Sequence, residues 1–497
     1  MSASRDALIA EIRATGTLRG LPTGHFIDGD HVAGLSGRML DSFDPGRGAV
    51  FARFAAGDAA DVDRAVASAR AALAGPWRDM APAERGRILM KAAELVRRDA
   101  ARLAVVESLD AGKRLSEAEG DIRSVARTFE YYAGCCDKLQ GASLPLGRDY
   151  VGFTVDEPVG VAAQVIPWNY PISTAARGIA PALAAGCAVV AKPAETTPFS
   201  ALLLAELLAE AGLPAGVFNV VTGLGREAGA ALVAHPGVDH VTFTGSVPTG
   251  IAVMQAAAVN VTRVVLELGG KSPLVVLADA DLDAAASGVL GAIFENAGQI
   301  CSAGSRLVVE RSIAAEFIAR LARAAEALSL GHGLDNPDVG PVNSAAHLDR
   351  IAAHVERARA NGNIIHAGGR IADAASHGGG WFYRPTIIEA ASPADPIVQE
   401  EVFGPVLAVQ VVDDLDAAIA VANATEFALA AGIYTADLTK AYRFARDVDA
   451  GQVYINEYFA GGIEVPFGGN RKSGFGREKG IDAVKSYCKV KSIVARI

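Results

Sequence analysis

The hydrophobic repeat of the chain changes near residue 150. Between residues 59 and 135, apolar residues recur three and four positions apart, which predicts amphipathic helices. Pro82 would open a long helix within this region, in the first turn, where proline is tolerated. From about residue 150, short runs rich in β-branched residues alternate with helical stretches. This alternation predicts parallel sheets with helices on both faces.

Two series of strands are expected, with a domain boundary near Leu268–Lys271. Strands of the first series are predicted at 160–166, 188–191, 218–221, 240–243 and 263–266. Strands of the second series are predicted at 272–276, 306–309, 406–412, 430–434 and 451–455. The fold class is therefore α/β, with two doubly wound domains. Such domains usually bind their ligand in the cleft between them.

Two further β-like segments, 140–156 and 486–497, lie outside both series. They are expected to pair as an arm, which is a common route to an oligomer. The first residues mix acids with bases and have no long apolar run, so they predict a short surface helix and not a signal peptide.

Composition narrows the classes of function. The chain has 497 residues, 51% of them hydrophobic and 21% charged, which is typical of a globular protein with two or three structural units. A net charge of −10 argues against nucleic acid as the main partner. No segment reaches the roughly 20 uninterrupted apolar residues that a membrane helix requires, so no membrane association is expected.

The five cysteines are Cys135, Cys136, Cys187, Cys301 and Cys488. Their odd number and spacing do not match a disulfide framework, which indicates a reducing compartment and makes the cytoplasm the default location. The nine histidines are scattered, and no His/Cys cluster has the spacing of a metal site. No metal is predicted.

Cys301 is the first candidate for chemistry. It follows a helical stretch and is flanked by Gly298 and Gly304, which would let the backbone approach a ligand closely. Most buried cysteines are inert small hydrophobes, however, so this residue alone is weak evidence.

Glu267 is the second candidate. It closes a β-branched apolar strand and is followed within two residues by a pair of glycines. A carboxylate in such surroundings can have a raised pKa, which suits a general base. Taken alone, a glutamate turned to solvent at a strand end is the better interpretation.

Asn169 is the third candidate. It lies in an aromatic–Asn–aromatic triplet framed by Pro167 and Pro171, directly after a predicted strand. Its side-chain amide is able to donate to a developing oxyanion. The alternative is an Asx-type turn residue.

Together, the order and spacing of seven motifs closely resemble the aldehyde dehydrogenase superfamily, from about residue 20 to the end of the chain. The motifs are PWNYP (167–171), KPAETTP (192–198), FTGS (243–246), LELGGKSP (266–273), FENAGQICS (294–302), EEVFGPV (400–406) and PFGGNRKSGFGRE (466–478).

The resemblance implies a catalytic role for each of the three candidates. Cys301 would attack the aldehyde carbon as a thiolate, and Asn169 with the Cys301 backbone N–H would hold the oxyanion. After hydride transfer to nicotinamide, Glu267 would activate water to hydrolyse the thioester. Coenzyme A-acylating relatives generally lack this glutamate, so a free acid product is favoured. A non-catalytic structural homologue would show erosion of this set, and none is seen.

The cofactor implied is NAD. Residues 219–229 nearly meet the dinucleotide fingerprint, but the third glycine comes one residue late, and a glycine-rich turn is the alternative. In the family, 243–250 carries the phosphates instead, at a helix N-terminus. Glu195 would accept from the ribose hydroxyls and repel a 2′-phosphate, which makes NADP less favoured. The residues implied to bind the cofactor are Ile166, Pro167, Trp168, Lys192, Glu195, Gly225, Phe243, Gly245, Ser246, Thr249, Leu268, Glu401 and Phe403.

Substrate residues implied by the resemblance are Tyr170, Thr174, Arg177, Glu295, Phe459 and Phe467, with the loop 457–465. Arg177 resembles the succinate-semialdehyde branch, but that branch has a second arginine where this chain has Glu295. A buried arginine needs a partner, which would be a substrate carboxylate or Glu295 itself. A polar or acid-bearing aldehyde is slightly favoured; Glu295 and Glu464 leave an aminoaldehyde open, and aliphatic or aromatic aldehydes are further alternatives.

Gly178 stands where many relatives have lysine, which puts in doubt a proton relay from that position to Glu478. Glu478 would then serve in an ion pair.

The resemblance also implies the domain plan. A Rossmann-like NAD-binding domain would comprise 1–138 and 157–267, a catalytic domain 268–480, and an oligomerisation arm 139–156 and 481–497. The expected assembly is a homodimer or homotetramer.

Overall fold

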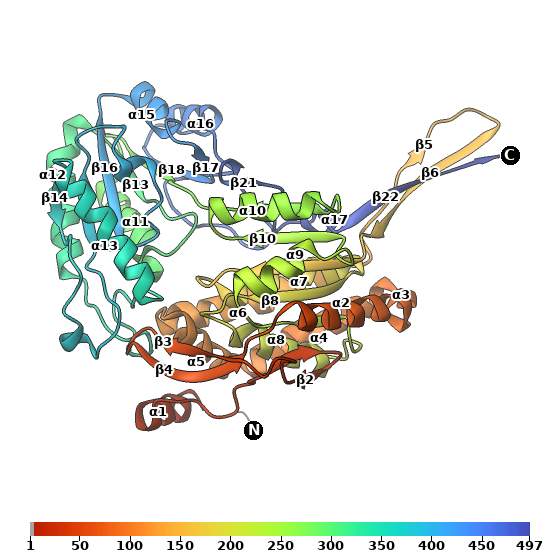
Figure 1. Cartoon of the computed structure of the whole chain (residues 1–497). Helices are drawn as coiled ribbons and strands as arrows, with labels where there is room; N and C mark the ends of the chain where they lie inside the picture. Colours follow the sequence, from red (N-terminus) through yellow and green to blue (C-terminus); the bar gives the residue numbers. More distant parts are fainter. Residues whose placement is uncertain (1–3) are drawn as a thin grey trace.

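A computed structural model describes residues 4–497 (Figure 1). Its first sheet has eight strands in the order β2-β1-β9-β8-β7-β10-β11-β21, and the five from β9 to β11 are parallel. Their bounds are β1 His25–Ile27, β2 Asp30–Val32, β7 Val161–Ile166, β8 Ala188–Pro193, β9 Phe218–Val220, β10 His240–Thr244, β11 Arg263–Glu267 and β21 Gly474–Phe475. The five predicted strands of the first series are confirmed, within one or two residues at each end.

The second sheet has seven strands in the order β14-β15-β16-β13-β12-β18-β19, all parallel except β14. The bounds are β12 Pro273–Val276, β13 Arg306–Glu310, β14 Ile364–Ala367, β15 Thr386–Glu389, β16 Val406–Val412, β18 Ala430–Tyr434 and β19 Gln452–Ile455. Along β12, Leu274 and Val276 pack into one hydrophobic cluster and Val275 into another. Both faces of the sheet are therefore covered, as the doubly wound prediction requires.

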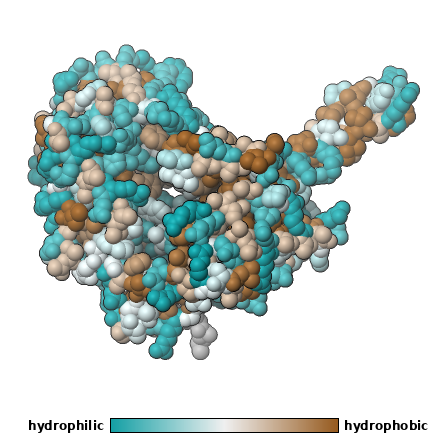
Figure 2. All heavy atoms as spheres, in the orientation of Figure 1, coloured by the Kyte–Doolittle hydropathy of each residue, from teal (hydrophilic) through white to brown (hydrophobic). Residues whose placement is uncertain are grey.

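An arm projects from the first sheet's side of the molecule and carries the C-terminus at its end (Figure 1). In it β6 (Tyr150–Pro158) pairs antiparallel with β22 (Cys488–Arg496) over nine residue pairs, and β5 (Ser143–Leu144) adds a short third strand. The two β-like segments thus pair as expected. Hydrophobic residues are visible along this arm in Figure 2, and Val490 and Val494 are 69% and 58% exposed.

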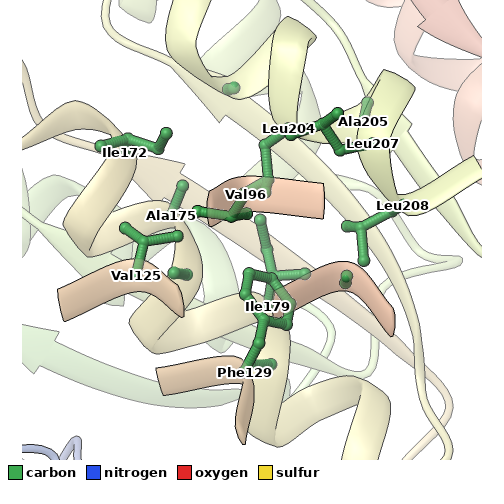
Figure 3. Packing of buried hydrophobic residues seen from close by; sticks show 14 of the residues in the cluster. Val96, Val125, Phe129, Ile172, Ala175, Ile179, Leu204, Ala205, Leu207 and Leu208 are labelled. Atoms are coloured by element: carbon green, nitrogen blue, oxygen red, sulfur yellow. The ribbon is translucent and has the colours of Figure 1, made fainter. Parts of the chain in front are cut away.

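The largest hydrophobic cluster lies under the first sheet, where four helices meet (Figure 3). These are α4 (Pro82–Arg98), α6 (Leu115–Ala133), α7 (Pro171–Ala185) and α8 (Phe199–Glu210). Phe129 and Ile179 are fully buried there. Between α4 and α6 runs α5 (Ala100–Ala111). The opposite face of the sheet is covered by α2 (Ala59–Ala74), α9 (Ala230–Ala234) and α10 (Val247–Ala258). This packing fixes the position of α7, whose first turn lies at the candidate active site described below.

The remaining elements complete the two units. Helices of the second unit are α11 Leu282–Phe294, α12 Arg311–Ala327, α13 Ala345–Ala360, α14 Pro396–Gln399, α15 Leu415–Ala422 and α16 Leu438–Asp447. Others are α1 Arg5–Thr15, α3 Pro76–Asp79, α17 Asp482–Ser486, β3 Met39–Asp44, β4 Ala49–Ala55, β17 Phe427–Ala428 and β20 Asn470–Arg471. The 3₁₀ and π segments are Gly225–Gly229, Glu295–Gly298, Gly333–Asp335 and Ala374–His377.

The chain ends and one short strand complete the comparison with the sequence predictions. The predicted N-terminal helix is present as α1, and its first three predicted residues fall outside the described part of the chain. Strand β21 joins the first sheet although it follows the second series in sequence. The segment 481–487 packs into the first cluster through Val484 and Tyr487. Within residues 4–497, no helix combines the length and apolarity needed to cross a membrane.

Candidate active site

A cavity of about 690 Å³ lies where the carboxyl ends of the first sheet's strands face the second unit. Ligands of open α/β sheets bind at this edge because the loops that follow the strands converge there. Cys301, Glu267 and Asn169 all line the cavity, and so do all thirteen residues predicted to bind a cofactor. Residues more than 130 positions apart in the sequence are thus brought to one place.

The segment before Cys301 has an unusual backbone. After α11 ends, Asn296, Ala297 and Gly298 all have positive φ, at 48°, 53° and 72°. A Cβ on Gly298 would lie 2.1 Å from the Gly404 carbonyl oxygen. Gly298 therefore permits close packing against the chain's own backbone, and not the approach of a ligand as expected. Gln299 stabilises the loop by donating to the Asn296 carbonyl (3.0 Å) and accepting from the Asn343 N–H (2.9 Å).

The Cys301 thiol is in a low-dielectric setting. Burial raises its pKa to about 11, and the nearby Arg177 guanidinium opposes that rise. A thiol with such a pKa is protonated at neutral pH, so nucleophilic attack requires a base.

Glu267 supplies a carboxylate without a hydrogen-bond partner. Its side chain is 2% exposed, and neither oxygen has a partner among the described residues. Burial, reinforced by the negative charge of Glu478, raises its pKa well above the usual range, while Arg177 opposes the rise. Once it is ionised, an unpaired buried carboxylate of this kind is a strong general base.

Asn169 is held with one amide hydrogen already used. Its Nδ2 donates to the Gln299 carbonyl (2.9 Å), and its own carbonyl accepts from the Asn296 side chain (3.2 Å). The side chain is 6% exposed in total. Because Nδ2 carries two hydrogens, the second remains able to donate into the cavity.

The far part of the cavity contains groups suited to ribose and phosphate. Lys192 donates to Glu195 (3.1 Å), and this ammonium lowers the pKa of Glu195 although burial opposes it. Ser246 and Thr249 lie at the N-terminus of the twelve-residue helix α10 and hydrogen bond to each other (2.9 Å). A helix N-terminus of this kind favours an anion.

The second unit closes the cavity with Glu401 and Phe403. Burial raises the pKa of Glu401 to about 7, and the Gly270 N–H donates to its carboxylate (3.0 Å). The Phe403 ring meets the Trp168 ring edge-on, with centroids 5.3 Å apart.

Sequence analysis missed three residues of α13 that also line the cavity, His347, Arg350 and His354. His347 bonds to the Phe403 carbonyl (2.7 Å) and receives a hydrogen bond from Arg350 (3.1 Å). The signal in the sequence was their spacing of three and four, which places them on one helix face. Within residues 4–497, no cluster of three or more His, Cys, Asp or Glu has the arrangement of a metal site.

Comparison with known proteins places the chain. The model of the aldehyde dehydrogenase family matches residues 31–493. The chain belongs to this family. A betaine aldehyde dehydrogenase of Rhizobium leguminosarum bv. trifolii is 43% identical over 94% of this chain and 96% of its own. An aldehyde dehydrogenase of Aspergillus niger is 42% identical over 96% and 95% of the two chains. A structure of Staphylococcus aureus betaine aldehyde dehydrogenase in complex with NAD+ is 36% identical, with a TM-score of 0.95 over 99% and 97% of the chains.

In this aldehyde dehydrogenase, Arg177 has a partner that the sequence did not predict. Its guanidinium forms an ion pair with Glu478, and its side chain is 16% exposed. It also lies 4.8 Å from the centroid of the Phe467 ring. Glu478 thus takes the place of the expected partner Glu295, although the Arg177 Nε still has no hydrogen-bond partner among the described residues. Sequence spacing gave no sign of a contact across 301 positions.

The other predicted substrate residues do not line the cofactor cavity. Tyr170 and Thr174 lie at the start of α7, one turn apart. Glu295 opens the Cys301 loop, and burial raises its pKa to about 6. Phe459 packs on Tyr458, whose hydroxyl donates to the Ser302 carbonyl (2.9 Å). Glu464, in contrast, is exposed and paired with Arg127.

Because Gly178 has no side chain, the side chain of Gln164 occupies the space beside it. A Cβ at this position would lie 2.1 Å from the side-chain oxygen of Gln164, which is turned toward α7. Gln164 in turn donates to the Tyr487 hydroxyl (2.8 Å). The space beside Gly178 is therefore filled by a neutral amide, and Glu478 pairs with Arg177.

Proposed function

We propose that this aldehyde dehydrogenase oxidises an aldehyde to the carboxylic acid with NAD, through a thiohemiacetal and a thioester on Cys301. The observation that carries the proposal is that Cys301, Glu267 and Asn169 line one cavity with the residues suited to a dinucleotide. Glu267 favours hydrolysis over transfer to coenzyme A, because an unpaired buried carboxylate is suited to activate water.

The residues present fit NAD. Lys192 and Glu195 would hold the adenosine ribose, the N-terminus of α10 the phosphates, and Glu401 the second ribose. Glu195 is partnered by Lys192 and therefore negative at neutral pH, which opposes a 2′-phosphate. The relative from S. aureus was solved with NAD+. When bound, this group supplies the hydride acceptor.

The chain's own residues would carry the covalent steps. The Cys301 thiol loses its proton to solvent, and the sulfur bonds to the carbonyl carbon as the C=O π electrons move onto oxygen. The free N–H of Asn169 donates to the resulting oxyanion. Departure of the hydride from that carbon leaves a thioester. Glu267 then takes a proton from water as the water oxygen attacks the thioester carbon. Cleavage of the C–S bond releases the acid and restores Cys301.

For the substrate, we favour an aldehyde that bears a cationic amine. Arg177 already has an anionic partner in Glu478, so it does not depend on a substrate carboxylate for one. Glu295, with a pKa of about 6, is mostly ionised at neutral pH. Burial raises the pKa of Tyr170, and the charges of Asp121 and then Glu295 raise it further. Relatives at 43% identity are named betaine aldehyde dehydrogenases.

A panel of three aldehydes tests both parts of the proposal. NADH formation is followed with an aminoaldehyde, succinic semialdehyde and a plain aliphatic aldehyde, with and without coenzyme A. The aminoaldehyde should have the highest kcat/KM, coenzyme A should not be required, and Glu295→Gln should reduce kcat/KM for the aminoaldehyde alone. A preference for succinic semialdehyde that Arg177→Leu abolishes would reverse the substrate assignment.

We also propose that the arm joins copies of the chain into a homodimer or homotetramer. Strand β22 is the edge of the arm's three-stranded sheet, and exposed Val490 and Val494 lie on one face of it. An exposed apolar edge strand is a template for pairing with another chain.

A further inference from the structure

A buried ion cluster lies beneath the Asn169 turn, outside the cofactor cavity. The Lys113 ammonium is 2.6 Å from Asp121 and 3.4 Å from Glu107. The side chains of Lys113 and Glu107 are fully buried. The same ammonium lies 4.0 Å from the centroid of the Tyr170 ring, within the range of a cation–π contact. Lys113 therefore supports the residue that directly follows Asn169.

Both carboxylates of the cluster bind the first turn of α7. Glu107 accepts from the Ile172 N–H (3.4 Å), and Asp121 accepts from the Ser173 hydroxyl (3.3 Å). The ion cluster therefore holds the turn that follows Asn169, from Tyr170 to Ser173, in place. The direction in which the Asn169 amide projects depends on this turn.

One turn earlier on α6, Glu117 holds the other half of the site. Its carboxylate accepts from the Asn296 N–H (3.0 Å) and pairs with Arg114 (2.8 Å). Asn296 is the first left-handed residue of the Cys301 loop, and its side chain donates to the Asn169 carbonyl. Glu117 therefore contacts the nucleophile's loop across the boundary between the two units.

We infer that Lys113, Glu117 and Asp121 form a positioning bracket that sets the Asn169 amide and the Cys301 loop relative to each other. Glu117 and Asp121 are four residues apart, so they project from one face of α6. The bracket acts through residues that touch substrate and is not itself catalytic. The inference rests on the proposed roles of Asn169 and Cys301.

A structural ion cluster without this role makes different predictions. Attraction between buried charges is largely offset by their desolvation, so such a cluster is weak evidence for stability by itself. Loss of a purely structural contact would lower the melting temperature without a selective effect on the chemical steps. The test must therefore separate stability, cofactor binding and chemistry.

The test compares Glu117→Ala with Glu117→Gln in the full-length protein. The alanine variant loses the acceptor for the Asn296 N–H, whereas glutamine retains a side-chain oxygen at that place. We expect Glu117→Ala to lower kcat and the rate of Cys301 alkylation by iodoacetamide at least tenfold, with the KM for NAD within twofold of the parent. Glu117→Gln should recover most of both rates.

A second variant and a matched control complete the experiment. Lys113→Met, which removes the charge at similar length, should lower kcat at least tenfold. Glu130 lies on α6 like Glu117, but it pairs with Arg97 of α4. Glu130→Ala breaks that ion pair and should leave both rates within twofold. The inference is overturned if Glu117→Ala behaves like Glu130→Ala, or if glutamine rescues neither rate.

Failure of the proposed function would be recognised separately. A parent protein that forms no NADH with any aldehyde would refute the function, whereas alkylation of Cys301, located by peptide mass, still reports on the bracket.

Discussion

Arg177 shows how far a single residue can be interpreted without its surroundings. Its place in the chain resembles a substrate-binding arginine, and burial requires it to have a partner. The partner is Glu478, which comes from the C-terminal part of the chain and is adjacent to Lys479, another charge near Glu267. The sequence predicted that Arg177 needs a partner and that Glu478 serves in an ion pair, but not that the two pair with each other, because that pairing depends on tertiary folding.

Replacement of Arg177 tests its influence on the nucleophile. Arg177→Leu removes the positive charge that opposes the raised pKa of Cys301, so that pKa should rise above its present value of about 11. Alkylation at pH 8 should slow about tenfold if the pKa rises by roughly one, because the thiolate fraction falls in proportion. The measurement is the iodoacetamide rate against pH.

The control for this variant removes both partners. Arg177→Leu alone leaves Glu478 buried and unpaired, which costs about 3–5 kcal/mol, so Arg177→Leu/Glu478→Gln is compared with it. An alkylation profile of Arg177→Leu equal to that of the parent would contradict the electrostatic role of Arg177, and the double variant shows whether a change in the single variant comes from the unpaired Glu478.

The pH dependence of turnover follows from two acids with raised pKa values. Both Cys301 and Glu267 are neutral at low pH and become reactive on losing a proton. We therefore expect kcat/KM to increase with pH from about 6 to at least 9. Where a single ionisation limits the rate, the increase should be up to about tenfold per pH unit. A maximum at or below pH 7 would show that neither group limits the reaction.

At the scale of elements, sequence patterns located the central strands well. β7 and β12 are buried on both faces, so they appear as largely apolar runs between turn residues, with Gln164 the one polar residue of β7. The strands β1 to β4, and β14 and β15, were not predicted. β1, β2 and β14 lie at or near sheet edges and are short or partly exposed, and the β3–β4 pair forms a separate two-stranded sheet. Their pairing depends on partners distant in sequence.

The loop before Cys301 was likewise beyond sequence reasoning in its details. The glycine was recognised, but the contact that requires it is with the backbone of Gly404, more than 100 residues later. A left-handed φ at Asn296 and Ala297 has no signature in the residue types alone, since asparagine only tolerates it and alanine disfavours it.

Gly298→Ala tests this loop. The new Cβ would combine a left-handed φ of 72° with a 2.1 Å approach to the Gly404 oxygen. We expect a loss of stability of about 1–3 kcal/mol and at least a tenfold fall in kcat, because the Cys301 backbone must shift. Thermal unfolding and NADH formation are measured together.

Gly291→Ala is the matched control, since a Cβ there meets no atom within 4 Å and the residue lies in helix α11. It should be neutral or stabilising by about 0.5–1 kcal/mol. Similar losses in both variants would mean that the loop conformation is not what limits activity.

At the scale of the whole molecule, sequence indicated that the two β-like segments pair, and they do so over nine residue pairs. No local sequence pattern predicted that the arm projects from the body of the protein. It arises because α17 and Tyr487 are anchored in the first core, so the strand that follows starts at the surface (Figure 1). The domain plan and the assembly built on it stay predictions.

Charge on the arm tests the assembly. Val490→Asp/Val494→Asp replaces two exposed apolar side chains on one face of the edge strand β22 with carboxylates. Light scattering should show a smaller molar mass for the variant than for the parent oligomer, because repulsion between the new carboxylates opposes pairing of the copies. Leu438→Asp, which is 67% exposed on α16, is the control and should leave the mass unchanged. An unchanged oligomer in the arm variant would locate the interface elsewhere.

The most direct test of the central claim separates the two halves of the reaction at Glu267. In Glu267→Gln, hydride transfer should still produce up to one NADH per Cys301, after which the thioester accumulates because water is no longer activated. Steady-state turnover should fall roughly 10²- to 10⁴-fold, and the peptide that contains Cys301 should gain the mass of the acyl group. Cys301→Ser, which lacks the sulfur, should show neither burst nor adduct. Continued turnover at the parent rate, or an acyl group on any other residue, would contradict the account.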